Sequence, residues 1–311
     1  MKQFEARLVE AVKRKREAEG LSLRALSTVV GISFSTLARI ERGEGLPDNN
    51  SKIRLLEWLG PAADEEGLSF ENVALVHFRA GKNVRSGTVQ ALLRAAECLK
   101  RNAAPSHSEQ APAGAGENGA VSLSKEELER TAEKFREDLG LHDNQPLDSL
   151  LLEIEGVEII PLRDSGCIDH ATRVKLSKDA CDEWSAMSVP LDQSHEQWSV
   201  LLNDCHSIER QRVTLLEEVW HILLGHKLTK ISKVAEAYGR TYDSVEEHDA
   251  YYLASAALLP RKAVIEAVSE RRSSIDIAHQ YGTSPELVDY RIKRLGLWRD
   301  HVGKRVALVQ N

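Results

Sequence analysis

The chain has 311 residues, of which 42% are hydrophobic, 29% charged and 5% aromatic, and its formal net charge is -7. This length predicts two or three buried cores, and the apolar runs stay far below the roughly 20 residues that a membrane-spanning helix needs. The N-terminal residues form no signal-peptide pattern and the four cysteines lie far apart without a C-x-x-C pair, so we expect a cytoplasmic protein with free thiols.

Positive charge gathers at the N-terminus. Residues 1–60 hold 11 Lys or Arg against 8 Asp or Glu, an excess of three positive charges, whereas the rest of the chain is acidic. The overall charge excludes a protein that coats nucleic acid with its whole surface. Any contact with phosphate groups is therefore expected within these 60 residues.

Residues 1–60 have the pattern of short helices. A helical stretch from Leu23 to Val30 is followed by Gly31, by Ser33 and by a second helical stretch from Phe34 to about Arg42. Gly31 tolerates the positive φ of a tight turn, and Ser33 can cap the second helix. The pattern predicts a helix-turn-helix unit, and a plain helical bundle is the alternative that the spacing leaves open.

The letters of this stretch resemble the helix-turn-helix of the phage-repressor and Cro (XRE) family. The matching positions are Ser22, Ala25, Leu26, Gly31, Ile32, Ser33 and the run Ala38-Arg39-Ile40-Glu41-Arg42-Gly43. The resemblance implies a homodimer that binds a double-stranded DNA operator, with the second helix in the major groove. It implies base contacts from Phe34, Ser35, Thr36 and Arg39, and further DNA contacts from Ser33, Arg24 and Arg42, the two arginines on phosphates. Solvated surface is the alternative role of these side chains.

Residues 61–101 are predicted to be a helical extension of this domain that serves in dimerisation. The run VALVHF is a strand-like interruption, and packing or solvation is the expected role of His77, Arg79 and Lys82. Residues 102–122 are rich in Ala, Pro, Gly and Ser, which predicts a flexible linker between two independently folded halves.

Residues 123–262 mix helices with short strands. Helical patterns in KEELERTAEKFREDLGL and PLDSLLLEIEG precede three strand candidates, VEIIPL, SAMSVPL and SVLLND. A long amphipathic helix follows in HSIERQRVTLLEEVWHILLGHKL. This order predicts an α+β domain.

Within that helix, the run LLEEVWHILLGH differs by one letter from a zincin helix. A zincin helix carries H-E-x-x-H, in which two imidazoles one turn apart bind zinc and the glutamate acts as general base. Here Glu217 stands at the first histidine position, Glu218 at the general-base position and His221 at the second histidine position. Three interpretations stay open: a metal site with a carboxylate ligand, a site that has lost its metal, and an ordinary amphipathic helix.

The flanking letters resemble the ImmA/IrrE-type metallopeptidase family from Leu123 to Pro260. The matches are Asn203, His206, Ser207, Arg210, Arg212 and Thr214 before the motif, and Asp249, Ala250, Leu253, Ala254, Leu258, Leu259 and Pro260 after it. The resemblance implies a zincin-like fold in which Glu218 is the general base, while His221, Asp249 and Glu217 bind the metal. Asp249 is one methylene shorter than the glutamate usual in the family.

The implied donor set is rich in oxygen. Three carboxylates stand against one imidazole, a set that suits Mn or Mg more than a catalytic zinc ion, so zinc is the cofactor that the family implies and manganese the alternative. His226 lies about 140° round the helix from His221 and can reach it only if the helix ends at Gly225. His248, beside Asp249, is a second minor candidate.

Residues 263–311 return to helical patterns. A glycine turn, a serine cap and a proline at 282–285 imitate a second helix-turn-helix, and its second helix is basic through Arg291, Lys293 and Arg294. Since the peptidases that this part resembles often end in helices packed on the catalytic domain, we expect packing rather than DNA contact.

The sequence thus predicts a multidomain protein, with an all-α helix-turn-helix domain at 1–60 and an α+β zincin-like domain at 123–262 that continues into C-terminal helices. The leading hypothesis is a bacterial or phage-borne regulator whose peptidase-like domain cleaves itself or a partner repressor in response to stress or prophage signals. The alternative is a non-enzymatic transcription factor whose altered domain is a sensor or partner-binding module. No membrane partner is expected.

Overall fold

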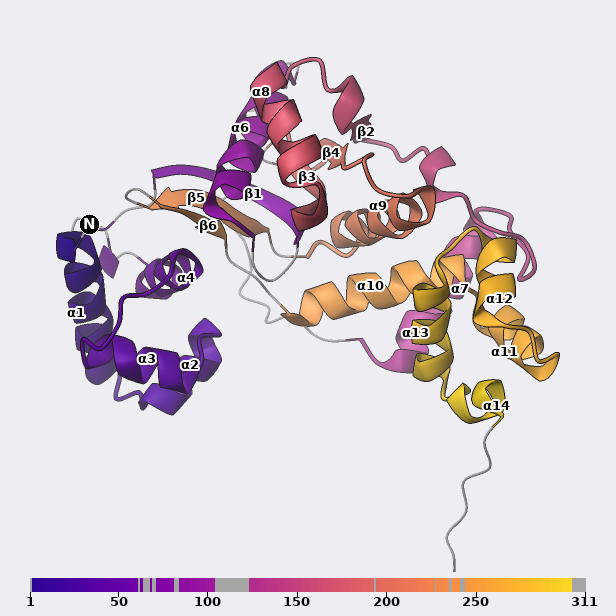
Figure 1. The fold of residues 1–311 in the computed structure, drawn as a ribbon, viewed down its shortest axis with the longest axis horizontal. Coiled ribbons are helices and arrows are strands. Elements are labelled where there is room, and N and C mark those ends of the chain that lie inside the picture. The colour runs from indigo at the N-terminus through magenta and orange to yellow at the C-terminus, as the bar shows by residue number, and fades with distance from the viewer. Residues whose placement is uncertain are drawn as a thin grey trace, which may run out of the picture.

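The computed structural model describes residues 2–60, 62–63, 68, 71–80, 84–103, 123–192, 194–226, 228–234, 237–240 and 244–303. Within these ranges no single helix is long and apolar enough to cross a membrane. One bent pair, Leu23–Val30 with Phe34–Glu41, passes that test of length and composition only when its two helices are counted together. Figure 1 shows the N-terminal helices beside a larger part that contains a sheet and the remaining helices.

The N-terminal part is a small helical bundle. Its helices are α1 (Lys2–Ala18), α2 (Leu23–Val30), α3 (Phe34–Glu41) and α4 (Asn49–Leu59). Their apolar faces meet in one core, which comprises Leu8, Ala11, Val12, Leu26, Val30, Ile32, Leu37, Ile53, Leu55, Leu56, Leu59, Ala63 and Leu68. A buried ion pair between Lys52 and Glu5, at 2.6 Å, ties α4 to α1. The predicted all-α N-terminal domain is confirmed.

The turn between α2 and α3 forms where the sequence predicts it. Gly31 has φ 64°, a left-handed conformation that residues with a Cβ rarely adopt, so this position favours glycine. The hydroxyls of Ser22 and Ser33 cap α2 and α3, each accepting a hydrogen bond from the backbone N–H three residues on, at 3.1 and 3.2 Å. The bend between the two helices is 117°, which is within the range of helix-turn-helix units.

Six strands form one mixed sheet. They are β1 (Glu71–Ala80), β2 (Val157–Pro161), β3 (Trp184–Pro190), β4 (Trp198–Leu202), β5 (Thr229–Val234) and β6 (Ala237–Arg240). Their order is β2-β4-β3-β1-β5-β6; β2 is parallel to β4 and the other neighbours are antiparallel. In the register of β1 with β3, His77 lies opposite Ser188.

Helices cover both faces of the sheet (Figure 1). On one face, α6 (Ser86–Asn102) and α8 (His170–Val174) pack over a core that includes Val76, Met187 and Val189. On the other face, α9 (Ile208–Leu223) packs over Ala186 and other residues of β3 and β4. Because side chains alternate along a strand, Ser188 and His77 point to the α9 face. The described residues also include three 3₁₀ turns, η1 (Ser149–Leu151), η2 (Leu162–Asp164) and η4 (Cys181–Glu183), and a short π-helix, η3 (Lys175–Asp179).

Strand β1 corrects the predicted domain organisation. The sequence predicts a helical extension at 61–101, but 71–80 form a strand inside the sheet, and α6 packs against it. Val76 and His77 point to opposite faces and are both buried, so the run VALVHF lacks the alternation that would separate a strand from a buried helix. Residues 71–102 therefore pack with the α+β part. The predicted linker at 102–122 connects two segments of this part, and all but its first two residues lie outside the described residues.

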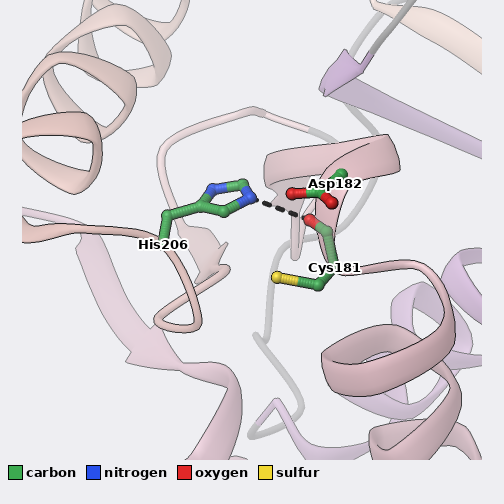
Figure 2. A group of neighbouring side chains, drawn as sticks. All are labelled: Cys181, Asp182 and His206. Atoms are coloured by element: carbon green, nitrogen blue, oxygen red, sulfur yellow. Dashed lines mark hydrogen bonds between the residues drawn. The ribbon is translucent and has the colours of Figure 1, made fainter.

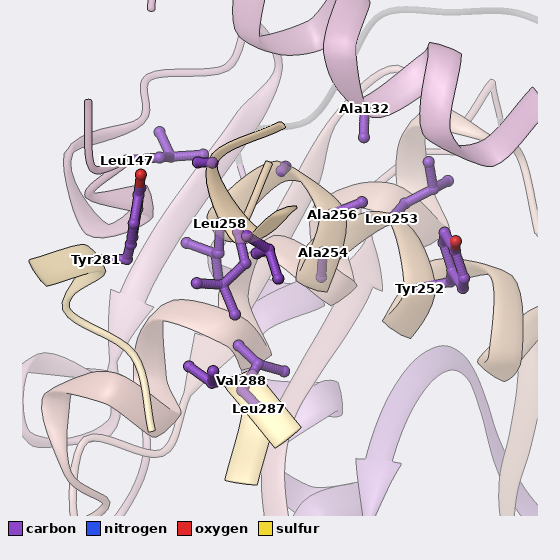
Figure 3. Close-up of a cluster of buried hydrophobic side chains, with 14 of the residues drawn as sticks. Ala132, Leu147, Tyr252, Leu253, Ala254, Ala256, Leu258, Tyr281, Leu287 and Val288 are labelled. Atoms are coloured by element: carbon purple, nitrogen blue, oxygen red, sulfur yellow. The ribbon is translucent and has the colours of Figure 1, made fainter. Parts of the chain in front are cut away.

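The other helices form a layer beyond α9. They are α7 (Lys125–Asp138), α10 (Ser244–Leu258), α11 (Arg261–Ser269), α12 (Ser274–Tyr281), α13 (Pro285–Leu295) and α14 (Trp298–Val302). Figure 3 shows the cluster in which they meet, where small residues such as Ala254 and Ala256 let α10 approach its neighbours closely. The predicted helical C-terminal extension is confirmed.

The second helix-turn-helix pattern serves packing, as expected. Gly282 ends α12 at φ 61°, and α13 turns Leu287, Val288 and Ile292 into the core. Arg291 of the same helix is fully buried and binds Glu129 of α7 with two hydrogen bonds of 2.7 and 2.8 Å. Of the three basic residues predicted on this helix, Arg291 is thus used inside the protein, whereas Lys293 and Arg294 are exposed.

Candidate functional site

The residues predicted to contact DNA lie on the exposed side of α2 and α3. Exposed members are Arg24, Ser33, Phe34, Ser35, Arg39 and Arg42, and Thr36 is partly exposed. Leu37 and Ile40 of the same helix point into the core, so the helical period leaves one side of α3 for a ligand. Phe34 keeps 45% of its surface exposed, which is a large apolar ring at the start of the helix that would enter a groove.

The contacts of these side chains within the protein are weak. The Arg24 guanidinium lies 5.5 Å from the centre of the Phe34 ring, and Arg42 forms an exposed ion pair with Glu44 at 3.0 Å. Exposed contacts of these two kinds contribute about 1 kcal/mol or less each. Both arginines can therefore exchange them for a phosphate. The Ser33 hydroxyl already caps α3. A DNA contact at this residue would therefore come from its backbone rather than from its hydroxyl.

Helix α9 buries the altered zincin motif. The helix begins at the Ser207 cap, and its motif lies in the middle of the domain, between the sheet and α10. Glu217, Glu218 and His221 are 2%, 0% and 4% exposed. A buried carboxylate costs free energy unless hydrogen bonds or a cation compensate its charge. The motif is therefore not the polar side of an ordinary surface helix.

Two buried donors converge with a partly buried one. Glu217 and His221 lie one turn apart on α9, and Glu247 reaches them from α10. One donor atom from each of the three lies within 4.8 Å of the others, and His221 Nε2 is 3.9 Å from Glu247 Oε1. The sequence interpretation named the first two residues and missed the third, which stands two positions before the carboxylate that it chose.

The structure does not bring Asp249 into this group. Its carboxylate accepts a hydrogen bond from Leu123 N at 3.1 Å and lies 3.3 Å from His248 Nδ1. Residues two apart on a helix differ by about 200° in direction, so Asp249 faces away when Glu247 faces His221. His248 is likewise turned elsewhere, because its Nε2 contacts Arg294.

Glu218 points from α9 to the sheet. The Ser188 hydroxyl of β3 donates to Glu218 Oε2 at 2.6 Å, and both residues are fully buried. This charge-assisted hydrogen bond fixes the carboxylate beside the three donors. The position is that of the general base in the motif, one residue after Glu217.

His77 is a member of the site that the sequence interpretation treated as packing. Its ring stacks on His221, with centroids 5.1 Å apart, and on Trp198, with centroids 5.4 Å apart. Burial, together with the nearby His226 and His195, lowers the pKa of His77 to about 3, so the imidazole is neutral at physiological pH. Only the register of β1 on the sheet brings His77 here, and no local pattern in the sequence signals it.

His226 returns to the site because α9 ends early. Gly225 has φ 62°, which turns the chain back at the end of the helix. As a result, His226 Nδ1 lies 2.9 Å from His221 Nδ1. The sequence predicted that His226 could reach His221 only if the helix ended at Gly225, and the helix does end just before this residue.

The donor set fits a divalent cation of intermediate hardness. Glu217 and Glu247 offer oxygen and His221 offers nitrogen, and a cation would compensate carboxylates that the fold has removed from water. Zinc accepts such ligands, but two carboxylates with one imidazole suit manganese at least as well.

Comparison with protein families assigns both halves of the chain. Residues 12–51 match the helix-turn-helix family model, and residues 184–293 match the model of the IrrE N-terminal-like domain of peptidase family M78. The chain thus carries a helix-turn-helix of XRE type and, in its second half, a domain similar to IrrE, in the order that the sequence predicts. Neither the comparison with curated proteins nor that with solved structures gives a match. The IrrE-like match begins at β3. Strand β1, which belongs to the same sheet, and helix α6, which packs against it, therefore lie before the matched region.

Proposed function

We propose that this protein is a transcriptional regulator that binds an operator as a homodimer through α3 and carries a metal site in its IrrE-like domain. The convergence of Glu217, His221 and Glu247 is the observation on which the metal site depends. Binding of chromosomal or phage DNA would place the protein in the cytoplasm. The dimer follows from the two-fold symmetry of operators that such domains bind.

The same site supports peptide hydrolysis of the kind that zincins perform. A divalent cation held by Glu217, His221 and Glu247 would supply a Lewis acid for a peptide carbonyl. Glu218 would take the proton of the attacking water and pass it to the leaving amine. Ser188 would hold the Glu218 carboxylate through its 2.6 Å hydrogen bond, and His77 would hold the ring plane of His221.

The substrate of this reaction would be a protein segment of the regulator itself or of a partner repressor. A DNA-binding domain and a peptidase-like domain on one chain bring the cleavage site and the operator complex together. Cleavage would release the operator in response to a stress or prophage signal.

A second function is favoured by the burial of Glu218. Its side chain is 0% exposed and one carboxylate oxygen is occupied by Ser188, which hinders the approach of water. In this alternative the IrrE-like domain binds the cation without hydrolysis and works as a sensor that alters DNA binding.

Metal content and cleavage separate these functions. The full chain is purified, stripped with a chelator and titrated calorimetrically with Mn²⁺ and Zn²⁺; for each metal we expect a site that His221→Ala abolishes, and only metal uptake that this variant removes counts. Incubation of the loaded protein is then followed by mass spectrometry, and fragments absent from Glu218→Gln indicate the peptidase. Metal binding without fragments, from the chain or from an added repressor, indicates the sensor. No uptake of either metal would refute both.

A further inference from the structure

The four cysteines, distant in sequence, form two pairs in the fold. The Cys98 thiol donates to Cys167 O at 2.6 Å beside the α6 core. The Cys181 and Cys205 thiols lie within hydrogen-bonding reach of each other; burial, with this neighbour and Asp204, raises the pKa of Cys205 to about 11. Among the described residues, Cys181 of the second pair belongs to a group of possible metal-binding side chains.

Cys181, Asp182 and His206 form a compact group at the start of β3. One donor atom from each lies within 4.8 Å of the others. Figure 2 shows the Cys181 thiol and the Asp182 carboxylate extending toward the His206 ring, whose Nε2 makes a 2.8 Å hydrogen bond with Cys181 O. Burial and the nearby Arg210 lower the pKa of His206 below its usual value, which keeps the ring neutral.

The backbone around this group is held by one buried side chain. Asn203 donates from Nδ2 to Cys181 O at 2.9 Å and accepts from Cys205 N at 3.2 Å, so it holds the two cysteine segments side by side. Because Cys181 O keeps this bond from Asn203, the His206 ring can give up its own bond to that carbonyl at small cost. Its Nε2 can then present a lone pair toward the thiol and the carboxylate.

We propose that Cys181, Asp182 and His206, with Cys205 recruited from beside Cys181 as the fourth ligand, form a second metal site, specific for a thiophilic divalent cation such as zinc. Two sulfurs, one imidazole nitrogen and one carboxylate oxygen complete a tetrahedral zinc ligand set. Binding displaces the two thiol protons to solvent, without oxidation of either sulfur. The site contrasts with the oxygen-rich group at Glu217, and it does not depend on the function proposed for that group.

The position of the site gives it a structural role. Cys181 and Asp182 lie in η4, directly before β3, whereas Cys205 and His206 directly precede Ser207, the cap of α9. A cation shared by these four residues joins the start of a central strand to the start of the helix that carries Glu217, Glu218 and His221. It therefore fixes where α9 begins.

Cobalt is the probe that tests this site, because thiolate ligation gives Co²⁺ an intense near-ultraviolet charge-transfer band. The full chain is reduced, stripped of metal and titrated with Co²⁺, then with Zn²⁺ in competition. We expect the band in the wild-type protein and in His221→Ala, and its loss in Cys181→Ser and Cys205→Ser. Zinc affinity of this site should fall at least ~100-fold in each serine variant, since loss of a mere outer-shell partner already costs 10- to 100-fold.

The other thiol pair supplies the matched control. Cys98→Ser and Cys167→Ser remove thiols that are partly buried, as Cys181 is, and should keep the band. An unchanged band in Cys181→Ser, or its loss in Cys98→Ser, would overturn the assignment. A disulfide between Cys181 and Cys205 in the purified protein would be detected as a mass lower by two hydrogens. If such a protein gave no cobalt band even after the disulfide was reduced, this result would overturn the assignment as well. Thermal unfolding in the His221→Ala background, which removes the first site, guards against misfolded variants: zinc should raise the Tm of that protein and of its Cys98 variant, and leave that of a folded Cys181 variant unchanged.

Discussion

The imidazole of His77 stacks on that of His221, with ring centroids 5.1 Å apart and planes inclined by 22°. One ring comes from β1, before the predicted linker, and the other from the centre of α9. An aromatic contact of this kind contributes about 0.5–1.5 kcal/mol beyond the burial of its surface and restrains the ring plane. The orientation of the candidate metal ligand His221 thus depends on a residue that lies 144 positions earlier in the chain.

Replacement of His77 should separate stacking from ligation. His77→Ala removes the ring beneath His221, so we expect metal affinity to fall about 10-fold, as for loss of an outer-shell partner. His77→Phe keeps the stack and should retain affinity within about threefold of the wild type. Calorimetric titration with Mn²⁺ measures both. Equal losses in the two variants would show that a ring nitrogen, rather than the stack, is required.

The two carboxylates of α10 offer a matched pair. Glu247→Gln removes a donor of the candidate metal group and should weaken Mn²⁺ binding by about 100-fold or more. Asp249→Asn keeps the acceptor for Leu123 N and should leave metal affinity unchanged. The reverse result would restore the ligand that the sequence alone selected.

Glu217→His restores the H-E-x-x-H pattern. The change exchanges a hard oxygen donor for an imidazole, so zinc should gain at least ~10-fold in affinity while manganese should lose. Competition between the two metals on the stripped protein measures the ratio. If the preference between zinc and manganese stays the same, residue 217 is not a ligand. The double variant with His221→Ala is the control: it should lose the added zinc binding if the zinc is bound at this site.

The parts of the protein that the sequence predicted are those set by neighbours in the chain. The turn at Gly31, the caps at Ser22 and Ser33 and the one-turn spacing of Glu217 and His221 all lie within a few residues. The errors concern contacts across the fold. β1 pairs with β3 over more than 100 residues, and an apolar strand without alternation gives no sign of its partner. Glu247 was missed because the family resemblance selects Asp249, two positions on, and only the packing of α10 against α9 brings the Glu247 carboxylate to His221.

Stability should depend on pH through Glu129. Burial raises the pKa of this carboxyl, but the hydrogen bonds from Arg291 and Tyr252 outweigh it and leave the pKa below 4.5. A lowered pKa in the folded state stabilises the protein above pH 4.5, and this contribution is lost as the pH falls through the folded-state value. Urea midpoints between pH 7 and pH 3 should therefore fall, and the fall should be smaller in Glu129→Gln.

The same variant tests the packing of α13. It leaves Arg291 buried without its carboxylate, which should cost about 3–5 kcal/mol at pH 7. Asp138→Asn, in an exposed pair with Lys134, is the control and should change stability by no more than about 1 kcal/mol. Equal effects of the two substitutions would mean that the buried pair is not part of the folded core.

Arg39→Ala tests the DNA-binding face. Arg39 is exposed on α3, and it is not among the residues of the N-terminal core, so its loss should leave the fold intact. If the guanidinium reads a base edge, operator affinity should fall by about 1–3 kcal/mol, with specificity relaxed at one position; a phosphate contact would instead lower affinity on all sequences and reduce the salt slope by about one. Fluorescence anisotropy with a duplex selected by the wild-type protein, at several salt concentrations, measures both quantities.

Lys134→Ala is the control for this prediction. It removes an equal charge from α7 and should bind DNA as the wild type does, because Lys134 lies on the other part of the protein. Affinity and salt slope that match the wild type in Arg39→Ala would exclude this arginine from the DNA contact.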